Sequence, residues 1–442
     1  MAGQAPDAID WPTVHREALD ILQRYIRIDT SNPPGNEAPA AHFLGEILEA
    51  EGLECDYIET HPNRELVMTR LRGDGRRGGA LLLGNHLDVV PVEEESWDVP
   101  PFEGLVRDGR IYGRGALDMK GCGVMQLMTV LLLHRLGVPL GRDVIFLAVP
   151  DEEAGSIRGI RWVIRHRPEL LDGIDFALNE GVGGITEFAG GEGRIFMPTI
   201  DEKGVAWLRL RATGPGGHGS VPTTENPAVR LLGALLRLAE WDRGLTFTPG
   251  TTALVERLAD AGILPDPADR DALAAALRSD PRSHAMFVHT LNVTLVEAGI
   301  KANVIPPRAE AVLDCRLLPG EDIEGWMEAV RAQIDDPLVE VEPEARDVYG
   351  TNPSDWESEL FLAIRDTMTE AVEDAIVVPG LATFATDNRF LREFGIPAYG
   401  FIPCLLSPEE LSGLHAHNEF LTVDNFEMGT ELTYEIVRRV VT

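Results

Sequence analysis

The chain has 442 residues, more than one compact core usually serves, so we expect two domains. Its 44% apolar and 25% charged residues are typical of globular proteins. The net charge of −33 argues against nucleic acid and against an anionic membrane as partners. Four scattered cysteines without a C-x-x-C pair, and a start without a signal-peptide pattern, predict a cytoplasmic protein with reduced thiols.

The first part of the chain alternates helical and strand-like segments. Helical spacing occurs at 13–27, 36–51 and 120–137. Short apolar runs typical of buried strands occur at 80–85, 144–149 and 175–180. This alternation predicts an α/β fold with a mixed, largely parallel sheet flanked by helices.

The pattern changes after residue 200. Strands are expected at 204–213, 290–299, 309–318 and 338–344, and helices at 227–240 and 321–334. Their order is the β-α-β-β-α-β of a ferredoxin-like unit, with a helical insertion at about 244–288. Because the α/β pattern resumes after about 346, we expect residues 200–345 to form a lid or dimerisation domain inserted between 1–199 and 346–442.

Acidic and histidine residues follow the apolar runs of the large domain. His86 and Asp88 come at the end of one run, and side chains two apart in a strand face the same side. Asp88 is therefore positioned to orient the His86 imidazole, as carboxylates commonly do for metal-binding histidines. Glu152 and Glu153 follow a second run in "VPDEEAG".

Three further motifs complete the pattern. Asp118 lies in the glycine-rich "GRGALDMKG", Glu180 follows the third run, and "GLHAHNEF" near the C-terminus offers His415 and His417. Each motif alone is most simply a solvated surface turn. Their shared placement at strand ends of one sheet instead favours a common site.

Two histidines and three carboxylates, one of them shared, can form a two-metal site for Zn²⁺ or a similar ion. Such a site activates a water molecule and polarises a carbonyl oxygen, and it needs a neighbouring base for the proton. One of the adjacent glutamates would then bind metal while the other does not. Neither "GPGGHG" nor "GDGRRGG" has the G-K-[ST] of a phosphate loop, and the absence of a dinucleotide fingerprint disfavours an oxidoreductase.

With these motifs the chain resembles the dinuclear zinc amidohydrolases and exopeptidases, the family of aminoacylase, carboxypeptidases G and S, acetylornithine deacetylase and succinyl-diaminopimelate desuccinylase. The resemblance is carried, in order, by "SNPPG", "GNHLDVVPV", "GRGALDMKGCG", "DEEAG", "NEG", "GPGGHGS", "ANVIP" and "HAHNE". "TDNRFLREFGIPAYGFIP" is most similar to the aminoacylase and carboxypeptidase S side.

The resemblance implies roles for the clustered residues. One metal would be bound by His86, Asp118 and Glu180, and the other by Asp118, Glu153 and His415. His415 is selected over His417 because the family's ligand histidine stands four residues before a glutamate, here Glu419. Glu152 would be the general acid/base and Asp88 the partner of His86. The resemblance also implies a cis peptide bond between Asp118 and Met119.

For the small domain the resemblance implies a contribution across a homodimer. His218 matches a histidine that reaches the partner subunit's site to stabilise the oxyanion, and Asn303 matches a polar residue that assists there. Arg316 and Arg389 are candidates for binding a substrate carboxylate, although ordinary surface salt bridges explain them equally well.

The sequence thus predicts a hydrolase with two Zn²⁺ ions per chain, Co²⁺ or Mn²⁺ being alternatives. It would cleave an amide or peptide bond next to a free carboxylate, in N-acyl amino acids or short peptides. A biosynthetic deacylase of the desuccinylase or deacetylornithine type, and a non-catalytic peptide-binding relative, remain alternatives. The length of the insertion leaves the size of the substrate open.

Overall fold

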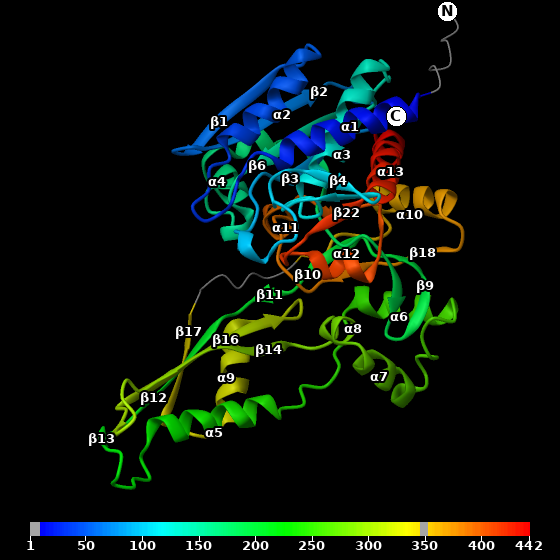
Figure 1. The fold of residues 1–442 in the computed structure, drawn as a ribbon. Helices are drawn as coiled ribbons and strands as arrows, with labels where there is room; N and C mark the ends of the chain where they lie inside the picture. The colour runs from blue at the N-terminus through cyan, green and yellow to red at the C-terminus, as the bar shows by residue number, and fades with distance from the viewer. Residues whose placement is uncertain (1–8, 345–351) are drawn as a thin grey trace, which may run out of the picture.

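The protein is described by a computed structural model of residues 9–344 and 352–442 (Figure 1). Its centre is an eight-stranded sheet. In spatial order the strands are β1 (Cys55–His61), β2 (Arg64–Leu71), β6 (Asp143–Val149), β3 (Ala80–His86), β7 (Ile174–Asn179), β20 (Ala398–Gly400), β10 (Thr199–Glu202) and β19 (Gly380–Ala382). The sheet is mixed, with β6, β3, β7 and β20 running parallel and with antiparallel pairs at β1–β2, β2–β6 and β20–β10.

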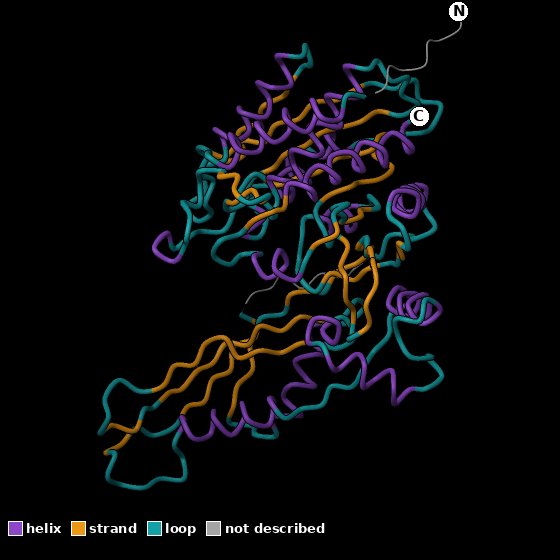
Figure 2. The backbone as a smooth tube through the Cα atoms, turned by 45° about the vertical axis from the view of Figure 1, so that its right-hand side comes forward, coloured by secondary structure: helices purple, strands orange, loops and turns teal. Residues whose placement is uncertain are grey.

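Helices cover both faces of this sheet, as Figure 2 shows. One face packs against α1 (Trp11–Ile26), α2 (Ala38–Ala50), α3 (Lys120–Arg135), α10 (Glu359–Ala371) and α13 (Val423–Val441). The other packs against α4 (Ile160–His166), the 3₁₀ turn η3 (Pro168–Leu171) and α11 (Asn388–Phe394). Successive residues of a strand point to opposite faces, so in β3 Leu81 and Leu83 join the first core and Leu82 joins the second. The expected fold class is confirmed.

A second, antiparallel sheet lies below the first in Figure 1. Its strands are β11 (Gly204–Val205), β12 (Leu208–Thr213), β14 (Thr290–Ala298), β16 (Arg308–Leu317) and β17 (Val339–Pro343). The helices α5 (Pro227–Ala239) and α9 (Ile323–Ile334) share a separate apolar core with it. At its far tip two short strands, β13 (Gly217–His218) and β15 (Val304–Ile305), pair with each other.

The predicted helical insertion forms α6 (Pro249–Asp260), α7 (Arg270–Ser279) and α8 (Pro281–Ala285). Helices α6 and α7, with Met286 and Phe287 after α8, share their apolar core with the hairpin of β8 (Gly184–Phe188) and β9 (Gly191–Phe196), away from the core of the second sheet. The hairpin is flanked by β18 (Ala375–Val377), which pairs with β9, and by β21 (Leu405–Leu406), which pairs with β8. The insertion therefore packs beside the large sheet.

The remaining elements are short. A three-stranded sheet comprises β4 (Leu105–Arg107), β5 (Arg110–Tyr112) and β22 (Phe420–Thr422). Two single 3₁₀ turns are η1 (Glu94–Ser96) and η2 (Glu152–Ala154), and α12 (Pro408–Gly413) is a short α-helix. The Asp118–Met119 peptide bond is cis.

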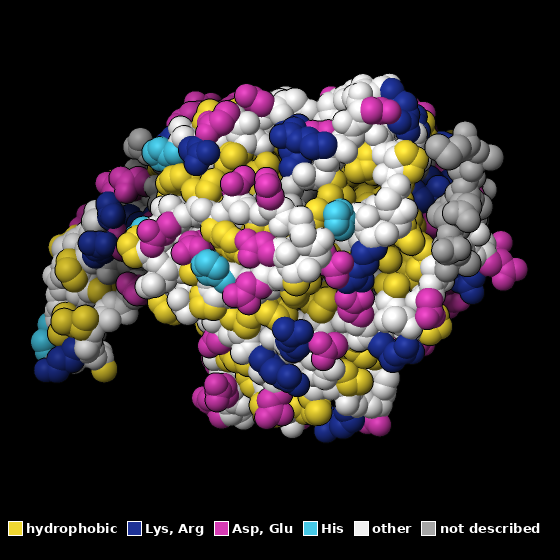
Figure 3. Space-filling view, turned by 90° about the horizontal axis from the view of Figure 1, so that it is seen from above, with side chains coloured by type: hydrophobic (Ala, Val, Ile, Leu, Met, Phe, Trp, Pro, Cys, Tyr) yellow, Lys and Arg dark blue, Asp and Glu magenta, His cyan; other side chains and the backbone are white. Residues whose placement is uncertain are grey.

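Only the first of the two expected boundaries of the inserted domain lies within the described residues. Strand β10 extends the large sheet to Glu202, three residues past 199. The second boundary, at 345–346, lies outside the described residues. None of the helices in the described ranges combines the length and apolar character needed to span a bilayer. On the face seen from above in Figure 3, acidic side chains are interspersed with basic ones.

Candidate metal centre

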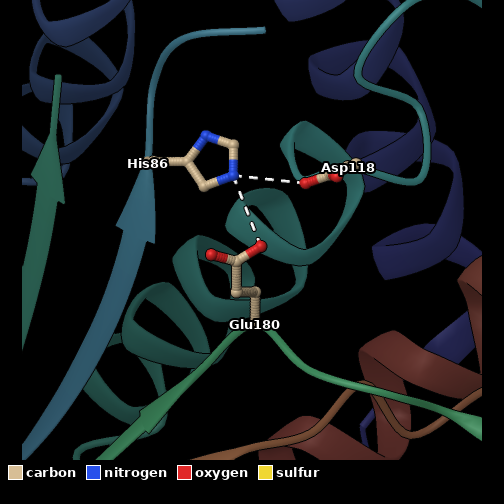
Figure 4. A group of neighbouring side chains, drawn as sticks. All are labelled: His86, Asp118 and Glu180. Atoms are coloured by element: carbon tan, nitrogen blue, oxygen red, sulfur yellow. Dashed lines mark hydrogen bonds and ion pairs between the residues drawn. The ribbon is translucent and has the colours of Figure 1, made fainter. Parts of the chain in front are cut away.

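Three side chains meet where β3 ends (Figure 4). His86, the last residue of β3, directs its Nε2 atom toward Asp118 Oδ1 at 3.2 Å and Glu180 Oε2 at 3.4 Å. Glu180 directly follows β7, the parallel neighbour of β3, so the two carboxyl ends bring these residues together. The three offer ligand atoms within 4.8 Å of one another.

A second group shares Asp118. His415 Nε2 lies 3.1 Å from Asp118 Oδ2 and 3.4 Å from Glu153 Oε2. Because His86 contacts Oδ1 and His415 contacts Oδ2, each oxygen of the Asp118 carboxylate faces one group. His417 takes no part, and its Nε2 atom lies 3.7 Å from Glu93.

Asp88 contacts the acidic turn as well as His86. The nearest partner of His86 Nδ1 is the Asp88 carbonyl oxygen at 2.9 Å, while Asp88 Oδ1 is 3.6 Å away. The Asp88 carboxylate accepts backbone N–H bonds from Glu152 at 3.0 Å and Glu153 at 3.1 Å, and the Asn32 side chain donates to it at 2.8 Å. Asp88 therefore ties the β3 end to the turn after β6.

The buried carboxylates of this centre strongly influence one another. Burial raises the pKa of Glu180 to about 8, and burial followed by repulsion from Glu180 raises the pKa of Glu152 well above its usual range. Hydrogen bonds to Asp118 and Glu153 raise the pKa of His415 to about 10. Four carboxylates and two histidines in one small volume form an environment that favours added positive charge.

The donor set fits two divalent cations. Each group offers one imidazole nitrogen and two carboxylates, which is the nitrogen and oxygen chemistry that Zn²⁺ accepts. Among the described residues, the buried Oε1 atoms of Glu153 and Glu180 have no hydrogen-bond partner. Buried carboxylate oxygens without partners are costly, and a cation at each group would satisfy them.

A buried ion pair that the sequence reasoning did not assign holds the Asp118 turn. Glu419 is fully buried; its Oε1 accepts the backbone N–H groups of Gly115, Leu117 and Asp118 at 2.8–3.1 Å. Its Oε2 accepts from Arg114 at 2.5 Å, and Arg114 also donates to the Ala416 carbonyl beside His415. Glu419 had served only to select His415 by spacing, and nothing in the local pattern indicated the Arg114 contact 305 residues away.

Two predicted site residues lie apart from these groups. His218 is exposed on β13 at the tip of the second sheet, where its Nδ1 contacts the Ser220 hydroxyl at 2.7 Å. Asn303 is its neighbour, because the Asn303 carbonyl accepts the Gly219 N–H at 2.8 Å. Figure 1 shows this tip far from the end of β3 in the same chain.

The two predicted substrate-binding arginines also have other contacts. Arg316 on β16 makes an ion pair with Asp314, with its Nε 2.7 Å from Oδ1. Arg389 on α11 places its guanidinium over the Phe390 ring, 4.5 Å from the centroid. Neither lines the cavity that borders the two groups.

That cavity measures about 710 Å³ and opens beside the two groups. Its lining includes Asp118, Glu152, Glu153, Glu180 and His415. From there it extends between β8, the end of the helical insertion and α12, where most of the lining is apolar. A pocket of this size accommodates a ligand of drug size.

Comparisons with known proteins agree with this arrangement. The family model described as peptidase family M20/M25/M40 matches residues 82–439. The human N-fatty-acyl-amino acid synthase/hydrolase PM20D1 is 30% identical over 81% of this chain and 73% of its own. Human aminoacylase-1 is 28% identical over 95% of this chain and 94% of its own.

Solved structures share the fold. A metallo-carboxypeptidase from Sulfolobus solfataricus, Sso-CP2, superposes with a TM-score of 0.72 at 21% identity, covering 96% of this chain and 99% of its own. The Saccharomyces cerevisiae di-peptidase Dug1p gives a TM-score of 0.70 at 18% identity, with 98% of both chains covered.

Proposed function

Because the chain belongs to the peptidase family M20/M25/M40 and is a hydrolase of that family, we propose that it cleaves the amide bond of N-acyl amino acids, next to the free carboxylate. The observation that carries the proposal is the Asp118 carboxylate, whose two oxygens face His86 and His415 at 3.2 and 3.1 Å beside Glu152. The similarity to human aminoacylase-1 over most of both chains supports N-acyl amino acids ahead of peptides.

In this proposal two Zn²⁺ ions are bound, one by His86, Asp118 and Glu180 and the other by Asp118, Glu153 and His415, with Co²⁺ or Mn²⁺ as possible substitutes. Bound there, the ions supply an acidified water and polarise the scissile carbonyl. The chain's own residues supply position and proton transfer.

Glu152 is the proposed general acid/base. It lines the cavity next to Glu153 and Glu180, and burial with neighbouring carboxylates raises its pKa. A carboxylate of raised pKa is suited to take a proton from water near neutral pH and return it to the departing amine. The Asp88 carboxylate accepts a hydrogen bond from the Glu152 backbone N–H, which fixes the backbone from which the Glu152 side chain extends.

A homodimer is part of the same proposal. Among the described strands β14 pairs only with β16, and its Val293, Leu295 and Val296 are exposed. On α5, Val229, Leu232 and Leu236 recur at helical spacing and are 65%, 61% and 58% exposed. An open strand edge and an apolar helix stripe on the same sheet-and-helix unit are suited to pairing with a second copy of the chain. His218 and Asn303, at the same tip, would then approach the other subunit's centre, and Arg316 and Arg389 would remain candidates for the substrate carboxylate.

The location is proposed from the thiols. The four cysteines are free, three of them buried, which agrees with a reducing compartment such as the cytoplasm. The expected absence of nucleic-acid and membrane partners rests on the net charge of −33.

The test is a panel of N-acyl amino acids and dipeptides, assayed with Zn²⁺, Co²⁺ or Mn²⁺ present. Each substrate is paired with its C-terminal amide, which lacks the free carboxylate. We expect a higher kcat/KM for each free acid than for its C-terminal amide. We also expect a higher kcat/KM for N-acyl amino acids than for dipeptides. Failure to cleave any amide with metal bound would overturn the proposal, and equal rates on acids and amides would remove the carboxylate requirement.

A further inference from the structure

The cavity beside the metal centre continues into an apolar chamber that none of the proposed metal or proton-transfer roles requires. Beyond the metal-binding residues its wall is formed by β8, the end of the helical insertion and α12. Apolar side chains of the lining include Val182, Ile185, Phe188, Met286, Leu411 and Leu414. They come from segments widely separated in sequence, so the chamber is a product of the tertiary fold.

The charged residues of the chamber lie at its margins. Away from the metal centre the lining contains Glu187, Asp280 and Arg282. Glu187 and Arg282 are exposed to solvent, and the Asp280 carboxylate accepts from the Ser283 hydroxyl and from two N–H groups at the start of α8. The interior therefore presents mostly apolar surface, and displacement of water from it by an apolar group is favourable.

The apolar lining favours a hydrocarbon chain over a peptide chain as the occupant of the chamber. A peptide would carry an amide into the chamber at every residue, and each buried amide without a partner is costly. A hydrocarbon chain carries none. A site built only for an acetyl group would also have no use for about 710 Å³.

We propose that this chamber receives the acyl chain of the substrate, so that the enzyme acts on N-acyl amino acids with extended apolar acyl groups, and that Ile185, Met286 and Leu411 set the accepted length. The inference rests on the proposed function. Ile185 lies on β8, Met286 directly follows α8 and is 6% exposed, and Leu411 lies on α12. The insertion thus supplies part of the wall that limits substrate size.

The first test is kcat/KM on one amino acid acylated with chains from acetyl to dodecanoyl. Full burial of a methylene changes affinity by up to about four-fold, since each is worth about 0.8 kcal/mol, so kcat/KM should rise steadily until the chamber is filled. If acetyl and dodecanoyl substrates are cleaved equally well, or the rate falls with length, the chamber proposal is wrong while the proposed function stands.

Two variants locate the effect. Ile185→Asp should lower kcat/KM for the decanoyl substrate at least ten-fold more than for the acetyl substrate. Leu338→Asp, which adds the same charge at an exposed leucine outside the cavity, should alter neither. Met286→Ala, which enlarges the chamber, should shift the preferred acyl chain to greater length. Loss of acetyl and decanoyl activity in equal proportion in the folded variants would overturn the assignment.

If no N-acyl amino acid is cleaved, including the acetyl form, the proposed function fails. A binding measurement then tests separately whether the chamber accepts an apolar chain. Calorimetric titration of the metal-loaded protein with 1-octanol, against ethanol, should then show binding of octanol alone with a negative heat-capacity change, weakened in Ile185→Asp. Absence of octanol binding, or binding unchanged in Ile185→Asp, would contradict an apolar chamber.

Discussion

The backbone N–H of Glu152 donates a hydrogen bond of 3.0 Å to the carboxylate of Asp88. The neighbouring N–H of Glu153 donates to the other oxygen of the same carboxylate. Asp88 also accepts from His86 through its carbonyl oxygen, so one residue positions His86 and both adjacent glutamates. With their backbones held alike, the two glutamates differ in where their side chains point, and Glu153 alone contacts His415.

The first prediction separates these glutamates. Glu152→Gln should keep near-normal metal content while kcat falls by roughly 10²–10⁴-fold, the usual contribution of a general acid/base. Glu153→Gln should lose one metal first, because its carboxylate faces His415 and Asp118. Metal analysis and steady-state kinetics on both variants check this. Two variants alike in metal content and rate would show that the roles are not divided.

The second prediction concerns metal content. The purified enzyme should contain two divalent ions per chain, because the two ligand groups share Asp118. Chelation should abolish activity, and adding Zn²⁺, Co²⁺ or Mn²⁺ should restore it. Elemental analysis alongside activity checks this, and full activity without bound metal would contradict it.

The third prediction concerns His218. Glu152→Gln should be nearly inactive because it lacks the general acid/base, and His218→Ala because loss of an oxyanion donor costs about 3 kcal/mol. When the two are co-expressed, half the dimers should be mixed, and each mixed dimer should have one intact site. About a quarter of wild-type activity should therefore return. A histidine that acts within its own chain would give no recovery at any mixing ratio.

The fourth prediction concerns the buried pair of Arg114 and Glu419. Glu419→Gln leaves the buried Arg114 guanidinium uncompensated, so the free energy of unfolding should fall by about 3–5 kcal/mol. Urea denaturation measures this. The matched control is Glu409→Gln, which breaks the more exposed pair with Arg110 at 2.8 Å and should cost at most about 1 kcal/mol. Equal costs would mean that burial of the pair adds nothing.

The fifth prediction concerns pH and Lys203, whose ammonium donates to the Ala285 and Val288 carbonyls and to the Thr290 hydroxyl. Burial, together with Arg316 and Arg243, lowers the pKa of Lys203 from 10.5 to about 7. Between pH 7 and 10.5 Lys203 is protonated in the unfolded chain and neutral in the folded one, so the free energy of unfolding rises with pH above about 7. Below pH 7 the folded protein bears the full destabilisation from burying the charged ammonium.

The measurement is urea denaturation of the wild type and of Lys203→Met at pH 7 and pH 9. The gain in stability between the two pH values should be smaller in the variant. Because both proteins share every other titrating group, the difference between their gains isolates Lys203. An unchanged gain would show that the lysine titrates normally in the folded state.

The fold and the clustering of His86, Glu153 and Glu180 could be anticipated from sequence for a physical reason. Apolar runs of strand length identify buried parallel strands, and the carboxyl ends of such strands meet at one edge. Polar residues directly after the runs, here His86, Glu153 and Glu180, must therefore converge. Asp118 precedes α3 and His415 follows α12, so their place in the cluster was expected from the family resemblance. The structure brings all five residues of the two groups together, while the roles of the individual residues remain predictions.

The sequence by itself determined which residues are strand ends and which side chains they carry, because strand and helix periodicity are local properties. Only the tertiary structure decided that Glu419 pairs with Arg114, that the insertion packs on the β8–β9 hairpin, and that the apolar chamber opens beside Asp118. These features depend on contacts between segments far apart in the chain. Such contacts follow from how complementary apolar faces pack, which no local pattern specifies.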